Sequence, residues 1–177
     1  MRKKKEIFFI TSGIVLIITA IIMILFSMSV YTLELKTFEE NKIIFRQRIK
    51  PGDKFTLKYT HSVALTPVWE MFEIDKKYQI TLIETDFLDH GAGLPYATFE
   101  DEIFMEEEGR FKIKNMHRVI PTPIYYRIGA IRENIFYFKD KEINLSSLVG
   151  DRLLTLEINR NNLFNYLRRK RRKLVNG

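Results

Sequence analysis

The first hydrophobic stretch of the chain covers residues 7–30, twenty-four positions without a charged side chain. At about 1.5 Å of rise per residue, this stretch is long enough to cross a hydrocarbon layer of about 30 Å as an α-helix. A helix satisfies its own backbone hydrogen bonds, so it is stable within lipid. Four basic residues, 2–5, precede it. Because such clusters stay in the cytoplasm, residues 1–30 are predicted to form a single-pass signal anchor in the cell membrane, with the rest of the chain outside the cytoplasm.

A cleaved secretory signal is the competing interpretation of this segment. Ser27 and Ser29 are small residues at the two positions that a signal peptidase reads. The apolar core of a signal peptide usually has only about 7–15 residues, so the uncleaved anchor is favoured. A lipoprotein anchor is excluded, because the chain contains no cysteine.

Beyond residue 30, short alternations of apolar and polar residues are typical of β-strands. Phe55, Leu57 and Tyr59, for example, alternate with polar neighbours. We expect strands over residues 31–38, 43–49, 55–60, 68–74, 79–87, 110–114, 124–131, 135–139, 142–145 and 153–158. Strands at this spacing, without amphipathic helices between them, predict an all-β domain over residues 31–159, an antiparallel β-sandwich or barrel. Asn161 or Asn162 is expected to cap a short basic C-terminal helix within residues 160–177.

The formal net charge of the chain is +7, and the excess of positive charge lies at its two ends. Residues 160–177 carry seven basic side chains and no acidic one, whereas residues 31–159 carry eighteen basic and twenty-one acidic side chains. The predicted domain is therefore slightly acidic, which argues against nucleic acid as a partner. Without cysteine, no disulfide or thiolate is available, and stability must come from packing, to which fourteen Phe and eight Tyr contribute.

Four short motifs follow one another in the first half of the predicted domain. They are Pro51-Gly52-Asp53, Tyr59-Thr60-His61-Ser62-Val63, Pro67-Val68-Trp69-Glu70 and Gly91-Ala92-Gly93-Leu94-Pro95. With these motifs the chain resembles an uncharacterised bacterial and archaeal exported domain family, domain of unknown function 1850. The resemblance covers roughly residues 43–158, and the basic C-terminal tail departs from the shared pattern.

The resemblance implies a context and no chemistry. Members of that family are encoded beside, or fused to, membrane subunits of TRAP (tripartite ATP-independent periplasmic) transporters of the TAXI subclass. The expected partners are therefore the membrane subunits or the solute receptor of such a transporter, together with the lipid bilayer.

The candidate site residues with side-chain chemistry are His61, Ser62 and Glu70. On a strand, His61 and Ser62 would point to opposite faces, so together they cannot form a nucleophile–base pair. The alternative is a purely structural role, with the His61 ring inside the sheet and Ser62 organising the next turn. Glu70 interrupts an apolar face of residues 68–74 and needs a polar partner if buried, for which His61 and Arg48 are the candidates. Glu70 and its partner would then form either a structural polar network or a small site for a cation or polar ligand.

The glycine-rich segment offers Gly91, Gly93 and Pro95 as interaction residues. Two glycines permit positive φ or a close backbone approach, and Pro95 stiffens the exit of the loop. The segment does not lie between a strand and a helix, so it is not a dinucleotide loop. We interpret it as an anion-holding nest, a docking loop or a simple corner of the sheet.

Metal and cofactor chemistry is not expected. His90 and His117 lack the spacing of zinc ligands, and the acidic residues around 103–105 match no calcium-binding loop, so we interpret this region as a hairpin with charged sides. An exported hydrolase is the weakest hypothesis, because the sequence contains no Gly-x-Ser-x-Gly motif and no carboxylates paired at a useful spacing. We predict no catalytic residues, no metal and no cofactor.

Six consecutive cations end the basic tail. They are Arg168, Arg169, Lys170, Arg171, Arg172 and Lys173. Near an anionic lipid surface, each cation contributes about 1 kcal/mol, so we expect contact with the membrane surface. A solvated tail that complements the helix dipole is the alternative.

Overall fold

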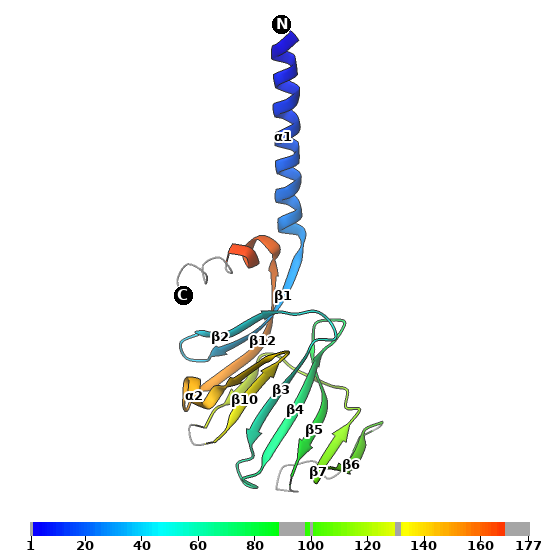
Figure 1. The fold of residues 1–177 in the computed structure, drawn as a ribbon, viewed down its shortest axis with the longest axis vertical. Coiled ribbons are helices and arrows are strands. Elements are labelled where there is room, and N and C mark those ends of the chain that lie inside the picture. Colours follow the sequence, from blue (N-terminus) through cyan, green and yellow to red (C-terminus); the bar gives the residue numbers. More distant parts are fainter. Residues whose placement is uncertain (1, 89–97, 100, 130–131, 169–177) are drawn as a thin grey trace. The chain divides into compact units, whose positions relative to one another are not determined.

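The computed structural model describes residues 2–88, 98–99, 101–129 and 132–168 (Figure 1). The chain divides into two compact units, residues 33–158 and residues 1–32 together with 159–177. Helix α1 covers Arg2–Ser27. It contains the apolar span Phe9–Ser27, with a mean hydropathy of 2.8 and no part buried in protein. One N-terminal helix is thus long and apolar enough to cross a membrane.

In the terminal unit, the end of α1 contacts the C-terminal segment of the chain. A short helix over residues 163–168 begins where the Asn162 side chain accepts a hydrogen bond from the Asn165 amide at 2.8 Å, which confirms the predicted cap. The Leu163 amide donates to the Met28 carbonyl at 2.9 Å. The ring of Phe164 stacks on Phe26 with 5.0 Å between centroids. The end of α1 and the segment that follows β12 are therefore held together by specific contacts.

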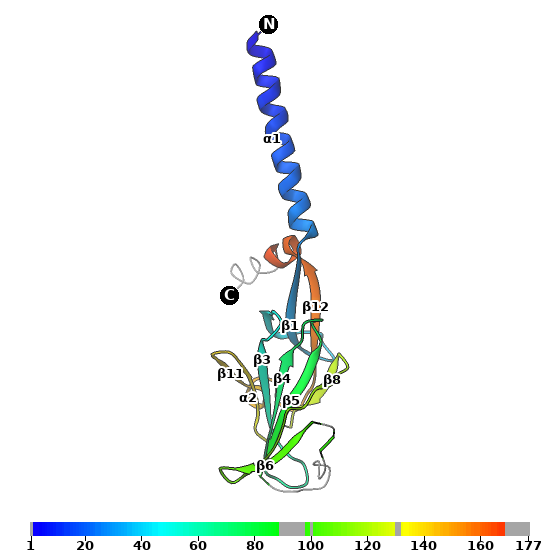
Figure 2. The same cartoon turned by 90° about the vertical axis from the view of Figure 1, so that its right-hand side faces the viewer.

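Two β-sheets form the rest of the fold (Figure 1). The four-stranded sheet has the order β2-β1-β12-β9, and the larger sheet has the order β11-β10-β3-β4-β5-β7-β6, with β8 paired to β5. The strands are β1 Ser29–Thr37, β2 Ile43–Arg48, β3 Lys54–Thr60, β4 Pro67–Ile74, β5 Ile80–Phe87, β6 Ile103–Glu107, β7 Arg110–Lys114, β8 Arg118–Ile120, β9 Ile124–Arg127, β10 Asn134–Phe138, β11 Lys141–Asn144 and β12 Leu153–Asn162. Figure 2 shows β3, β4 and β5 side by side, with β8 beside β5.

Aromatic side chains connect the two sheets within residues 33–158. Phe45 of β2 lies 4.9 Å from Phe136 and 5.6 Å from Phe138 of β10, measured between ring centroids. Edge-to-face contacts of this kind add to the burial of large apolar surfaces. Aliphatic side chains from both sheets complete the core, among them Leu33, Leu35, Leu57, Ile74, Ile80, Leu154 and Leu156. The predicted all-β sandwich, with flanking helices, is confirmed.

The structure also corrects several predicted boundaries. The strand expected over 124–131 ends at Arg127, and the last strand continues from Leu153 to Asn162. Strand β8 has only three residues, too few for a recognisable alternation. Helix α2, Leu145–Val149, was not predicted, although Asn144 caps it by accepting a hydrogen bond from the Ser147 amide at 3.0 Å. The acidic segment forms the hairpin of β6 and β7 that its sequence indicated.

Candidate functional site

Glu70 lies on the face of β4 that carries the core residues. Val68, Phe72 and Ile74 share this face and are buried, so the predicted interruption of an apolar row by Glu70 is confirmed. The Tyr59 hydroxyl donates a hydrogen bond to Glu70 Oε1 at 3.2 Å. Burial raises the pKa of the Glu70 carboxyl above its ordinary value, and the bond from Tyr59 offsets only part of this shift. The site therefore favours the neutral form of Glu70.

The predicted partners of Glu70 were wrong. His61 follows β3 in the turn that leads to β4, and its ring Nδ1 accepts hydrogen bonds from the amides of Val63 at 3.3 Å and Ala64 at 3.1 Å. The ring therefore organises this turn, the role expected of Ser62, and does not bond within the sheet. Arg48 is exposed at the end of β2, in the other sheet. The partner of Glu70 is a phenol because Tyr59 occupies the same face of the neighbouring strand.

A second tyrosine extends this polar cluster to the other sheet. Tyr126 of β9 contacts the Tyr59 ring edge to face, with 6.1 Å between centroids. Its hydroxyl donates to Asn134 Oδ1 at 3.2 Å, and Asn134 Nδ2 contacts the Ser146 hydroxyl at 3.0 Å. Burial raises the pKa of Tyr126, and so do its neighbours Tyr59 and Glu70. Tyr126 and Asn134 were not predicted as site residues, because nothing in the sequence distinguishes them from other residues of strands β9 and β10.

An open pocket of about 810 Å³ lies beside this cluster. Its wall includes Tyr59 and Thr60 at the end of β3, His61 and Ser62 in the following turn, and Tyr126 and Arg127 of β9. Asn134 lies on the wall as well, and so does Arg132, whose guanidinium Nη2 donates to the Ser62 carbonyl at 3.4 Å. The structure thus gathers His61 and Ser62 at one pocket, with Glu70 bonded to a residue of its wall.

The remaining predicted site residues lie elsewhere. Gly91, Gly93 and Pro95 fall outside the described residues, and so do residues 169–173 of the basic tail. Arg168 is exposed at the end of the C-terminal helix.

Two acidic residues in and beside the β6–β7 hairpin are paired with neighbouring cations. Glu107 binds Lys112 at 2.8 Å and Lys114 at 3.2 Å, and Glu102 binds Arg118 at 2.7 Å. Among the described residues, no group of three or more His, Asp or Glu side chains could hold a metal ion.

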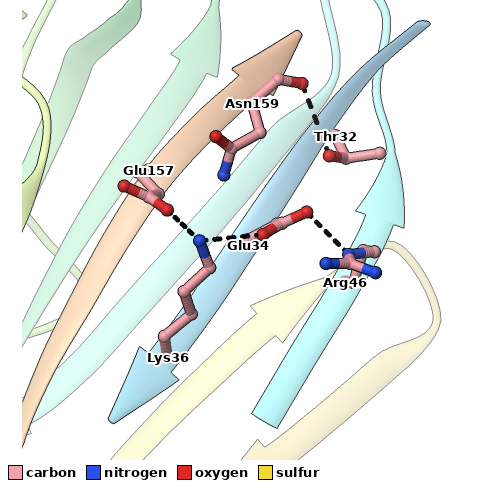
Figure 3. Close-up of polar contacts among 6 residues, drawn as sticks. All are labelled: Thr32, Glu34, Lys36, Arg46, Glu157 and Asn159. Atoms are coloured by element: carbon pink, nitrogen blue, oxygen red, sulfur yellow. Dashed lines mark hydrogen bonds and ion pairs between the residues drawn. The ribbon is translucent and has the colours of Figure 1, made fainter. Parts of the chain in front are cut away.

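A separate charged cluster lies on the smaller sheet (Figure 3). Glu34 of β1 is 1% exposed, and its carboxylate accepts from Arg46 Nε of β2 at 2.6 Å and contacts Lys36 Nζ at 3.0 Å. Lys36 in turn donates to Glu157 of β12. The cluster links three neighbouring strands, and sequence reasoning did not single it out.

Comparison with known proteins places this chain in a family. The family described as Domain of unknown function (DUF1850) matches residues 55–145. The chain belongs to this family. The DUF1850 match extends from β3 into α2 and includes Glu70, His61, Tyr126 and Arg132. Neither the curated proteins nor the solved structures include a significant match.

Proposed function

We propose that this DUF1850 protein is a membrane-anchored, non-enzymatic accessory protein that binds a transport system outside the cytoplasm. The resemblance of its motifs supports a TAXI-type TRAP transporter as the partner, through either its membrane subunits or its solute receptor. The observation that carries the proposal is the combination of an apolar span, Phe9–Ser27, with a β-sandwich in one chain.

Contacts within the terminal unit support anchoring. Phe26, near the end of the apolar span, stacks on Phe164, and Leu163 bonds to the Met28 carbonyl. Phe164 and Leu167 remain 39% and 47% exposed, although both are apolar. A short helix with exposed apolar side chains next to the end of a membrane span suits the lipid–water boundary. Residues 168–173 would then meet lipid phosphates with their positive charges.

The contacts of the candidate residues support a binding role over catalysis. His61 Nδ1 accepts from two backbone amides, and Glu70 Oε1 accepts the Tyr59 hydroxyl. A general base must present a free atom to its substrate, and these two atoms already have partners within the protein.

Anchoring has a direct energetic consequence for such an accessory protein. A domain tethered to the membrane that holds its partner has a high effective concentration there, on the order of millimolar for a short tether. A weak interface is then sufficient for lasting association.

Co-purification tests the proposal. The full chain is expressed with a TAXI-type TRAP transporter from the same genome, crosslinked in intact cells and recovered in mild detergent. We expect the transporter to be recovered with it. The matched control replaces residues 1–28 by a cleavable export signal, and it should recover at least tenfold less transporter because the effective concentration falls.

Two results would contradict the proposal. One is recovery of the full chain without any transporter subunit under crosslinking. The other is turnover of an ester or glycoside by the purified chain, which would revive the hydrolase hypothesis.

A further inference from the structure

The pocket beside Tyr59 and Tyr126 has an excess of positive charge among its described residues. Arg127 Nη2 is paired with Asp151 at 2.8 Å, and both side chains are more than half exposed at the rim. Arg132 has no described carboxylate within ion-pair distance, and its described contact is with the neutral carbonyl of Ser62 at 3.4 Å. The Arg132 guanidinium on the wall therefore has no counter-charge among the described residues.

Hydrogen-bond donors lie beside this guanidinium. Because His61 Nδ1 accepts from two amides, the proton of the neutral ring must be on Nε2, where it is available to donate. Thr60 and Ser62 add two hydroxyl groups to the same wall. A guanidinium with an imidazole N–H and hydroxyls is a donor set that suits an anion.

Two acids lie on or next to this wall. Asp151 lines the pocket and is paired with Arg127. Glu70 accepts the hydroxyl of the wall residue Tyr59 at 3.2 Å, and burial raises the pKa of its carboxyl. The Tyr126 hydroxyl donates to Asn134, so the protons of both phenols are already engaged and their rings remain as apolar surface.

The size and the aromatic walls of the pocket favour an organic ligand. Its volume of about 810 Å³ lies within the range of about 300–1,000 Å³ typical of small-molecule sites. The rings of Tyr59 and Tyr126, 6.1 Å apart between centroids, supply apolar surface next to the donors. Such a site matches a molecule with one carboxylate and a compact carbon skeleton.

We propose that this pocket binds a small organic anion, with Arg132 holding its carboxylate and His61 donating a second hydrogen bond. The sequence left a cation or a polar ligand open for Glu70 and His61, and this proposal commits to an anion. The pocket proposal does not depend on the transporter partner, since ligand binding and co-purification are measured separately.

Calorimetric titration of the purified full chain in detergent tests the proposal. The probes are acetate, succinate and benzoate, with benzamide as the neutral analogue of benzoate and inorganic phosphate as a competing anion class. We expect at least one carboxylate to bind, and benzamide to bind at least tenfold more weakly than benzoate wherever benzoate binds. Absence of binding by all three carboxylates, equal binding of benzamide and benzoate, or binding of phosphate alone would overturn the proposal.

Arginine variants assign the binding to the proposed residue. Arg132→Gln should weaken carboxylate binding at least tenfold, whereas Arg152→Gln should change it less than threefold, because Arg152 pairs with Glu40 and does not line this pocket. Arg132→Lys keeps the positive charge and should bind the carboxylate more tightly than Arg132→Gln does. This comparison separates loss of charge from loss of folding. Equal affinity of Arg132→Gln and the unaltered chain, or of the Lys and Gln variants, would contradict the assignment.

Discussion

Two carboxyl groups on core strands of this domain have pKa values that are shifted in opposite directions. Glu34 on the smaller sheet is 1% exposed and contacts two cations, Arg46 at 2.6 Å and Lys36 at 3.0 Å (Figure 3). Glu70 on the larger sheet contacts one neutral donor, the Tyr59 hydroxyl. Burial raises the pKa of both carboxyls, but at Glu34 the hydrogen bonds and charges of Arg46 and Lys36 outweigh it and lower the pKa.

The difference shows that partners, and not burial alone, decide the direction in which the pKa of a carboxyl shifts. A buried charge costs several kcal/mol unless hydrogen bonds and opposite charges compensate for it. At Glu34, Arg46 and Lys36 provide this compensation, and the bond from Arg46 links β1 to β2. At Glu70 the hydrogen bond from Tyr59 offsets only part of the effect of burial, so the pKa stays raised.

The largest effect is expected when one cation of the Glu34 cluster is removed. Arg46→Met removes one of the cations that contact Glu34, and removing one partner of a buried ion pair costs about 3 kcal/mol. Chemical denaturation of the full chain in detergent, followed by the fluorescence of Trp69, measures the free energy of unfolding. The matched control is Arg152→Met, whose pair with Glu40 is exposed and should contribute less than about 1 kcal/mol. Equal losses in both variants would remove the distinction between the clusters.

A smaller effect is expected at the tyrosine that contacts Glu70. Tyr59→Phe keeps the ring but removes the donor, which should lower the free energy of unfolding by about 1 kcal/mol. Tyr125→Phe serves as the control. Because Tyr125 is 59% exposed, this variant should have almost the same free energy of unfolding as the unaltered chain. An unchanged stability of Tyr59→Phe under the same denaturation would show that the phenol does not stabilise Glu70.

The smallest effect concerns the dependence of stability on pH. The pKa of folded Glu70 is raised, so the folded chain binds more protons, and this group loses stability as the pH rises from about 4.5 through the folded pKa. Glu70→Gln should therefore gain stability relative to the unaltered chain as the pH rises from about 4.5 towards neutrality.

Glu34 should show the opposite sign. Its folded pKa is lowered, so its contribution is present above about pH 4.5 and is lost as the pH falls through the folded pKa. Glu34→Gln should consequently be most destabilised near neutral pH and least so in acid. Denaturation curves of both variants are measured between pH 4 and 8. If the free energy of unfolding changed with pH in the same direction in both variants, the pKa values of the two carboxyls would not be shifted in opposite directions.

The alternation of residues predicted most of the strands because a strand with one face in the core must be apolar at every second position. Residues 55–60 and 68–74 illustrate this, since both became strands within one residue of their predicted bounds. Strand β8 and helix α2 escaped prediction because three and five residues are too few to show a period. The sequence singled out Glu70 because it interrupts an apolar row, and His61 and Ser62 because of the motif that contains them, and their role in a site stays a prediction.

The sequence by itself determined the apolar helix, the all-β class and the position of a carboxylate on a core face, because each depends on neighbours close in the chain. Only the tertiary structure decided which side chains meet. Tyr59 is eleven positions from Glu70 in the chain, and Arg132 is seventy positions from Ser62. Strand register and sheet packing bring these groups together, and the spacing of residues along the chain specifies neither. The sign of the pocket's charge is therefore a property of the folded protein.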